Sequence, residues 1–208
     1  MHELAREIRR LRGGDVGRMV KARLAEFRRC GRGGSRILFK EMCFCILTAN
    51  YTAERAMAIQ EAVGGGFVTL TERRLADKLR KLGYRFPNTR ASYIAAARKH
   101  IKGLDGRIKS SCSGTELRDW LVKNVKGLGM KEASHFLRNV GFEDLAIIDF
   151  HIIDVLVRHR LIRRPKTLTR SRYMEIEGVL RGLADELGMS LAELDLYLWH
   201  METGKVLK

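Results

Sequence analysis

Proline is scarce in this sequence, and long apolar runs are absent from it. Only two prolines, Pro87 and Pro165, occur in 208 residues, so few positions are barred from a helix by a missing N–H group. No apolar run approaches the roughly 18 residues of a membrane-spanning helix. The polar beginning, Met1-His2-Glu3, lacks the apolar segment of a signal peptide. We therefore expect a cytoplasmic protein without a membrane anchor.

Cysteine is also rare, and its four positions lack the spacing of a metal site. The residues are Cys30, Cys43, Cys45 and Cys112, with no CxxC pair and no nearby histidine. Cys43 and Cys45 lie within the apolar run 42–47, which favours buried thiols. We expect a reducing, intracellular compartment, no bound metal and no cofactor.

Acidic residues are far outnumbered by basic ones. Forty Lys and Arg residues against 24 Asp and Glu residues give a formal net charge of +16. A basic surface can serve solubility alone, but an excess this large is typical of proteins with a polyanionic partner. Nucleic acid is the favoured partner, because nothing in the sequence supports binding to an anionic membrane.

No segment alternates between apolar and polar residues as a half-buried strand would. Apolar residues instead recur at helical spacing in the segments 75–82, 117–121, 133–140 and 173–187. Gly188 is suited to end the last of these, and Ser190 with Glu193 forms a capping box for the next helix. The run 42–47 is apolar on all sides, as in a helix buried within a bundle. The sequence predicts an all-α protein.

Glycine-rich breaks divide the helical pattern. They lie at residues 31–34 and 64–66, with a further loop around 109–114. These breaks predict a central helical bundle domain over residues 35–115. Residues 1–34 and 116–208 would form a terminal helical domain, with a DNA-binding cleft between the two domains.

Residues 117–140 have the layout of a helix-hairpin-helix motif. A helix over 117–124 is followed by a hairpin over 125–129 and a second helix over 130–140. Gly127 and Gly129 allow positive φ and a close backbone approach, so that N–H groups can face a phosphate. The positive end of the second helix dipole lies at the same place. An ordinary turn between two helices is the alternative, since a GxG pattern alone is weak.

Two residues near this hairpin have the chemistry of a catalytic pair. Lys131 lies in the first turn of the second helix, where the dipole disfavours added positive charge and so favours the neutral amine of a nucleophile. Asp149 follows 18 residues later, before a helix expected over 150–162. Lys131 can equally be a solvated surface lysine, and Asp149 a helix N-cap. A capping carboxylate held at a cleft can also stabilise a cationic transition state.

Longer segments make the chain similar to a known family. The hairpin Gly127–Lys131 followed by Ile147–His151 resembles the helix-hairpin-helix DNA glycosylases. The segments Cys43–Ala53, Lys131–Gly141 and Leu194–Lys208 extend the likeness to the archaeal-type 8-oxoguanine DNA glycosylase/AP lyases. The resemblance covers most of the chain, and the spacing between the lysine and the aspartate makes it specific.

The resemblance implies a mechanism and a DNA contact. Lys131 would attack C1′ of the damaged nucleotide, and the resulting Schiff base would permit β-elimination of the 3′ phosphate. Asp149 would stabilise the oxocarbenium-like centre and assist proton transfers. Asn50 would fill the hole left by a flipped base, or else cap a helix end. His151 would contact a phosphate, or is simply a polar residue of a first helical turn.

The resemblance also implies a base pocket. Phe86 and Trp199 would form aromatic walls for the flipped base, although core packing explains either residue equally well. Lys208 would help to distinguish 8-oxoguanine from guanine, which differ by a carbonyl at C8 and a proton at N7. A terminal carboxylate at Lys208 could accept from N7–H. The alternative for Lys208 is a frayed tail.

Two further absences narrow the comparison with related enzymes. No cysteine follows Cys112, so the iron–sulfur cluster common in endonuclease III and its adenine-removing relatives has no ligands. The extra sheet domain of eukaryotic 8-oxoguanine glycosylases has no counterpart here. We expect a prokaryotic, nucleoid-associated monomer that acts on double-stranded DNA containing 8-oxoguanine. A glycosylase for another oxidised base and a non-catalytic DNA-binding module are the alternatives.

The charge excess leads to a first prediction. Affinity for a short DNA duplex should fall steeply as salt is raised from 50 to 200 mM, because each phosphate contact releases a bound counterion. The slope of log affinity against log salt should be about −0.9 for each phosphate contact. Fluorescence anisotropy over a salt series measures it, and a flat response would contradict a phosphate-gripping surface.

Overall fold

The structure is a computed structural model that describes residues 2–111 and 113–208. Within these ranges the chain forms thirteen α-helices and one short 3-10 helix, with no strand. This confirms the predicted all-α class. Met1 and Cys112 lie outside the described residues, so the expectations that involve them are not addressed. No helix in the described ranges is long and apolar enough to cross a membrane.

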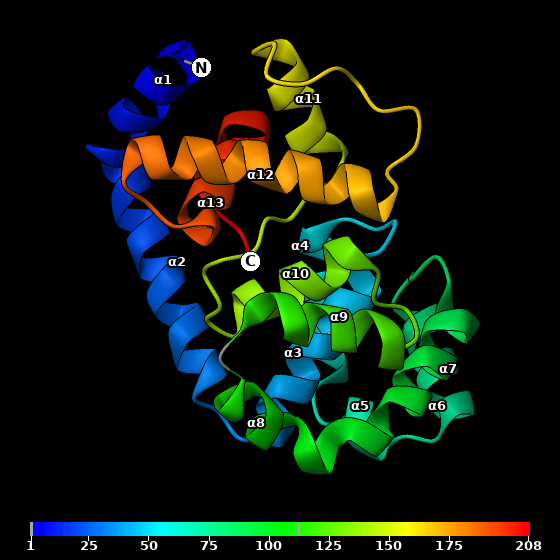
Figure 1. The fold of residues 1–208 in the computed structure, drawn as a ribbon. Coiled ribbons are helices and arrows are strands. Elements are labelled where there is room, and N and C mark those ends of the chain that lie inside the picture. Colours follow the sequence, from blue (N-terminus) through cyan, green and yellow to red (C-terminus); the bar gives the residue numbers. More distant parts are fainter. Residues whose placement is uncertain (1, 112) are drawn as a thin grey trace.

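The helices follow one another through short connections (Figure 1). In chain order they are α1 (His2–Arg12), α2 (Asp15–Gly31), α3 (Ser35–Thr48), α4 (Ala53–Val63), α5 (Gly66–Thr69), α6 (Glu72–Lys81), α7 (Pro87–Ala97), the 3-10 helix η1 (Arg98–His100), α8 (Ile101–Ser110), α9 (Gly114–Asn124), α10 (Met130–Asn139), α11 (Phe150–Arg158), α12 (Arg170–Leu187) and α13 (Leu191–Thr203).

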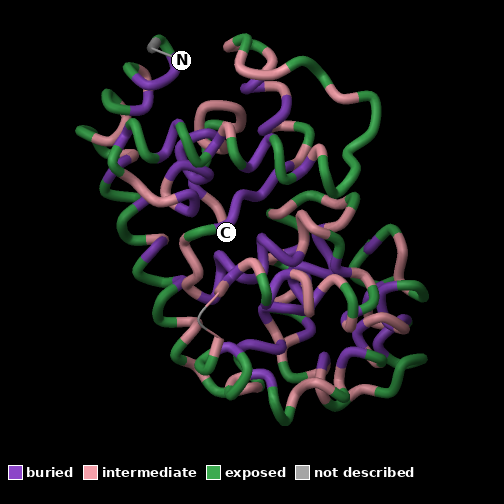
Figure 2. The backbone as a smooth tube through the Cα atoms, in the orientation of Figure 1, coloured by how far each residue is buried: buried purple, intermediate pink, exposed green. Residues whose placement is uncertain are grey.

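Two apolar clusters form the interior. The first joins α3 to α10 and contains buried side chains between residues 38 and 145. The second joins α1 and α2 to α11, α12 and α13, with buried side chains from residues 4–27 and 146–206. Figure 2 shows the buried stretches running through both groups of helices. The apolar faces of α9 and α10 pack with the central helices, whereas the predicted terminal domain includes them; the domain boundaries themselves stay a prediction.

Local sequence signals explain several helix ends. The Ser190 hydroxyl accepts the Glu193 N–H at 3.1 Å at the start of α13, and Gly188 ends α12 with φ +59, as the sequence predicts. The helix expected over 150–162 is shorter and ends at Arg158. The chain there turns through Arg160, which has φ +57, a conformation that no helix continues.

The buried helix at 42–47 is confirmed by α3. Its side chains from Met42 to Leu47 are fully buried at the centre of the first cluster. Cys43 and Cys45 are therefore buried thiols, and burial raises the pKa of each well above its usual value. Neither thiol is suited to reactivity at neutral pH.

A buried ion pair joins the two clusters. The Arg118 guanidinium on α9 donates to both carboxylate oxygens of Glu177 on α12, at 2.6 and 3.1 Å. Arg118 is fully buried and Glu177 is 2% exposed. Glu177 also accepts the Ala146 N–H at 2.9 Å, so the same carboxylate holds the extended segment that leads to α11. Buried charges require such partners, because an unpaired one is costly.

This pair leads to a second prediction. Glu177→Gln keeps the side-chain shape but leaves the Arg118 charge buried without its counterion, so the free energy of unfolding should fall by about 3–5 kcal/mol. Urea unfolding followed by circular dichroism measures the loss. Glu175→Gln is the matched control, because Glu175 pairs with Arg172 on the exposed side of α12 and should change stability by less than about 1 kcal/mol. Equal effects of the two changes would contradict the proposed importance of the buried pair.

Candidate active site

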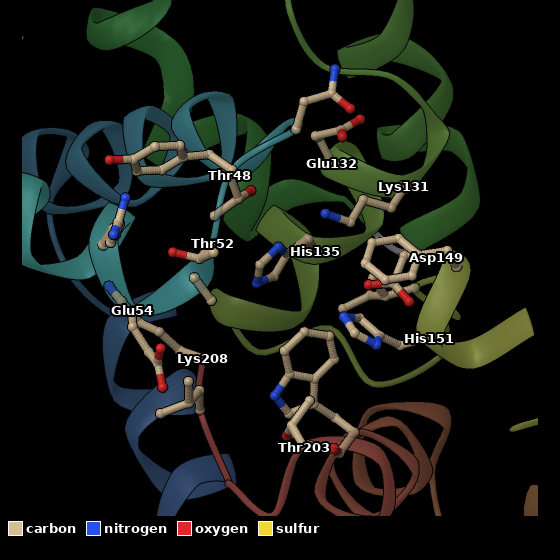
Figure 3. Close-up of a pocket in the computed structure, with 18 of the residues that line it drawn as sticks. Thr48, Thr52, Glu54, Lys131, Glu132, His135, Asp149, His151, Thr203 and Lys208 are labelled. Carbon is tan, nitrogen blue, oxygen red and sulfur yellow. Dashed lines mark hydrogen bonds between the residues drawn. The ribbon is translucent and has the colours of Figure 1, made fainter. Parts of the chain in front are cut away.

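A cavity of about 860 Å³ opens between the two groups of helices. Its walls come from the α3–α4 connection, α10, the start of α11, α13 and the segment that follows α13 (Figure 3). Residues far apart in the sequence thus share one site. The lining residues that the sequence singled out are Asn50, Lys131, Asp149, His151, Trp199 and Lys208.

Lys131 lies in the first turn of α10, as predicted, and its amine points into the cavity (Figure 3). The start of this helix is fixed by a local bond, in which the Glu132 carboxylate accepts the Gly129 N–H at 3.2 Å. Ala133 and Phe136 of the same helix are fully buried in the central core. The lysine is therefore half-buried on a rigid helix rather than solvated on a mobile loop.

Asp149 lies on the same wall, at the N-terminus of α11 (Figure 3). Its Oδ1 accepts the Ile152 N–H at 3.1 Å, so the predicted N-cap is confirmed. The residues before it are also fixed: the Tyr173 hydroxyl accepts the Ile148 N–H at 3.2 Å and donates to the Ala146 carbonyl at 2.7 Å. The Asp149 carboxylate therefore caps α11 and lines the cavity at the same time.

Two buried polar residues of α10 and one of α13 surround this pair. Arg138 forms a short ion pair with Asp195, and both line the cavity. Burial raises the pKa of Asp195 to about 6, with the Arg138 charge opposing and the Asp149 charge adding to the shift. Burial also lowers the pKa of His135 well below its usual value, and the Arg138, Lys131 and Lys208 charges act in the same direction. His135 is therefore a neutral imidazole at physiological pH.

Aromatic rings form the part of the wall beside Asp149. The Trp199 and His151 rings meet edge to face at 4.8 Å between centroids, and the Phe150 ring lies 3.9 Å from His151. Phe150 is 64% exposed, which is high for a large apolar residue. A planar group that enters the cavity would meet these rings near Asp149.

Lys208 is ordered against the wall rather than frayed. Its Nζ donates to Glu41 Oε2 at 2.8 Å and to Gln60 Oε1 at 2.5 Å. The ammonium group also lies 4.4 Å from the centre of the Phe44 ring. Segments 148 or more residues apart in the sequence therefore meet at this lysine.

Asn50 lies at the mouth of the cavity, in the turn after α3. Its φ of +59 is a left-handed conformation, which asparagine tolerates better than most residues. The side chain is exposed. This placement suits a residue that projects towards a DNA duplex.

Three other residues that the sequence singled out lie outside the cavity lining. Gly127 has φ +96, and a Cβ there would lie 2.5 Å from a ring carbon of Tyr93, so only glycine fits. Gly129 has φ −87, contrary to the expected positive φ, because it is the N-cap of α10. Phe86 is the N-cap of α7 and is half-buried against the central core, with the Arg85 guanidinium 4.9 Å above its ring.

Comparisons with known proteins agree with this geometry. The family model described as 8-oxoguanine DNA glycosylase matches residues 20–189. The chain belongs to the 8-oxoguanine DNA glycosylase family. The resemblance expected from the sequence is thereby confirmed.

Relatives of this glycosylase family match along nearly the whole chain. A protein of Korarchaeum cryptofilum named 8-oxoguanine DNA glycosylase/AP lyase is 49% identical, over 99% of this chain and 98% of its own. A protein of the same name from Methanocaldococcus jannaschii is 46% identical, over 99% of both chains. The M. jannaschii enzyme crystallised with a 15-mer DNA containing 8-oxoguanine superposes with a TM-score of 0.96 at 44% identity, over 99% of this chain and 100% of that one.

Sequence reasoning missed the buried polar residues of this glycosylase-family site. His135, Arg138 and Asp195 match no chemical motif, although they lie within the segments that carry the family resemblance. Periodicity gives no signal for His135 and Arg138, since they lie on the side of α10 opposite the apolar stripe of residues 133, 136, 137 and 140. The structure buries them nevertheless, and the ion pair between Arg138 and Asp195 joins α10 to α13.

The buried carboxyl of Asp195 leads to a third prediction. Its pKa is raised in the folded state, from 3.8 to about 6, so the folded state holds this proton between those values while the unfolded state has lost it. The contribution of Asp195 to stability is therefore present below about pH 4 and is lost as pH rises through about 6. Asp195→Asn should remove this part of the pH dependence. Urea unfolding of both proteins from pH 4 to 7 measures it, and parallel curves would contradict the raised pKa.

Proposed function

We propose that this chain removes 8-oxoguanine from duplex DNA and then cleaves the abasic strand. The observation that carries the proposal is the placement of Lys131 and Asp149 on one wall of a cavity of about 860 Å³, in a chain of the 8-oxoguanine DNA glycosylase family. A base inside a duplex cannot reach such a cavity, so the damaged nucleotide would turn out of the helix to enter it.

Lys131 would be the nucleophile. Its neutral amine forms a bond to C1′ of the nucleotide as the bond from C1′ to the base breaks, and the base leaves with the electron pair and takes up a proton. The bound amine then gives up one proton, the C1′–O4′ bond breaks as O4′ takes up a proton, and the open sugar is left as a protonated Schiff base. Nucleophilic use requires the deprotonated amine.

Asp149 would stabilise the positive charge that develops on the sugar. Its cap fixes Oδ1 beside the Ile152 N–H, so the carboxylate is oriented before substrate arrives. The Schiff base then makes the C2′ proton acidic. Loss of that proton and departure of the 3′ phosphate as leaving group complete the β-elimination, with no cofactor in the scheme.

DNA would be held by the basic surface and by the α9–α10 hairpin. Gly127 permits the tight turn, and the hairpin at Gly127 and Gly129 would face a phosphate beside the N-terminus of α10. His151 would contact a second phosphate, and Asn50 would occupy the space left by the flipped base. Trp199 and Lys208 would line the base pocket. We assign Phe86 no part in the pocket, because it lies outside the cavity lining.

We further propose that the chain acts as a monomer on the DNA of a prokaryotic nucleoid. The net charge of +16 supports direct association with DNA. Lys131 and Asp149 lie on the same chain and line the same cavity, which supports catalysis by a single copy.

A fourth prediction tests the nucleophile. Incubation with an 8-oxoguanine duplex and borohydride should trap a covalent protein–DNA adduct, because borohydride reduces a Schiff base to a stable amine. Lys131→Gln should abolish the adduct, whereas Lys102→Gln, an exposed change on α8, should leave it intact. Gel electrophoresis resolves the adduct. An undiminished adduct with Lys131→Gln would refute the assignment, and a panel of oxidised pyrimidine duplexes tests whether another lesion is preferred.

A fifth prediction separates the chemical role of Asp149 from its role as a cap. Asparagine is as good an N-cap as aspartate, so Asp149→Asn should leave stability and DNA affinity nearly unchanged. Base excision should fall by roughly 100-fold, because the negative charge facing the sugar is lost. Single-turnover excision, thermal unfolding and anisotropy measure the three quantities. Equal losses in all three would instead show that the residue acts only through the fold.

A further inference from the structure

Two polar residues, Glu41 and Gln60, lie behind the cavity and do not line it; we call them the latch. Glu41 on α3 and Gln60 on α4 together bind the ammonium group of Lys208. We propose that Glu41 and Gln60 are positioning residues that fix Lys208 in the wall of the base cavity, and so determine how well a damaged base is recognised. This inference rests on the proposed function and concerns only the base-excision step.

The contacts of the latch leave little freedom to the lysine side chain. Its Nζ donates at 2.8 Å to Glu41 and at 2.5 Å to Gln60, while the Phe44 ring lies 4.4 Å away. The Gln60 amide is itself held, because its Nε2 donates to the Lys40 carbonyl at 2.9 Å. The carbonyl oxygen of Gln60 therefore faces the ammonium group. These contacts offset the conformational entropy that a free lysine side chain would keep.

Glu41 is held from its other side as well. Its Oε1 accepts the Asn139 amide N–H at 2.6 Å, and Glu41 is only 6% exposed. The side-chain oxygen of Asn139, Oδ1, accepts two hydrogen bonds from the Arg138 guanidinium at 2.9 and 3.1 Å. Arg138 in turn pairs with Asp195 in the cavity wall. A continuous buried network thus runs from the latch to the vicinity of Asp149. Networks of this kind hold their members in one arrangement.

The latch determines where the Lys208 backbone lies. A hydrogen bond between that backbone and the His135 imidazole raises the pKa of His135, against the stronger lowering by burial. The Lys208 backbone and the neutral His135 ring therefore form one section of wall. If the ammonium group were released, the backbone would lose its tether, and this section of the wall would lose its fixed position.

Other contacts hold the neighbouring residues independently. Val206 is 5% exposed and belongs to the second apolar cluster. Lys205 forms an ion pair with Glu54 at the exposed rim. Opening the latch should therefore free Lys208 without detaching the whole segment that follows α13.

The test compares two substrates with one set of variants. Glu41→Gln, Gln60→Met and Lys208→Met each open the latch, and the third removes the ammonium group without shortening the chain. Single-turnover excision from an 8-oxoguanine duplex should fall roughly 10- to 100-fold in each variant, since a small misplacement of a substrate-positioning group costs this much. Strand cleavage of a preformed abasic duplex should stay within about twofold, because that substrate has no base to recognise.

The double variant Glu41→Gln/Lys208→Met should be no worse than the poorer single variant, because both changes break the same contact. Glu175→Gln on the exposed side of α12 is the charge-matched control and should leave both activities unchanged. Gln60→Met and Lys208→Met carry the test if Glu41→Gln folds poorly.

Three outcomes would overturn the inference. Unchanged excision in all three variants would show that the latch does not act in recognition. Parallel losses of excision and abasic-strand cleavage, with a lower Tm, would show a purely structural role. Additive losses in the double variant would show that Glu41 and Lys208 act separately. A wild-type protein that processes neither duplex would refute the proposed function itself, which distinguishes that failure from failure of the latch.

Discussion

The buried ion pair between Arg118 and Glu177 is the contact on which the geometry of the site depends. Lys131 belongs to a helix of the first apolar cluster, whereas Asp149 begins a helix of the second. Met130, next to Lys131, packs against the second cluster, and polar contacts fix the relation between the two clusters further. The Glu177 carboxylate provides such a contact, because it binds Arg118 on one side of the boundary and the Ala146 N–H on the path to Asp149. A charged pair at such a place adds little net stability over apolar packing, but it permits only one alignment.

Polar groups at the boundary between the two clusters also neutralise the buried charges around the cavity. Arg138, the partner of Asp195, lies next to Asn139, the partner of Glu41, so the buried carboxylates of two other helices are satisfied by neighbouring residues of α10. This helix therefore carries Lys131 at its start and the neutralising groups near its end. In a poorly solvated site, fixed partners of this kind replace the water that would otherwise surround each charge.

Much of the fold could be predicted because its signals are local. Helical periodicity, the caps at Asp149 and Ser190, and the glycine after α12 each depend on residues within one turn. Predictions failed where the decisive contact is distant in sequence. The backbone of Gly129 follows from its bond to Glu132, and Phe86 packs on the central core rather than in the cavity. The partners of Glu41 lie 19, 98 and 167 residues away, so no spacing rule could identify them. The packing of α9 and α10 with the central cluster likewise depends on contacts between residues far apart in the sequence, whereas the domain boundaries stay a prediction.

The order of the two clusters along the chain has a consequence for synthesis. The first cluster uses residues 38–145 and can close while the ribosome is still extending the chain. The second combines α1 and α2, which are synthesised first, with residues 146–206. The apolar faces of these early helices therefore stay uncovered until residues more than a hundred positions later have been synthesised. Such long-range closure is slow. A nascent chain therefore carries Lys131 on a folded helix before Asp149 and Lys208 are held in place, and the cavity is complete only with the final helices.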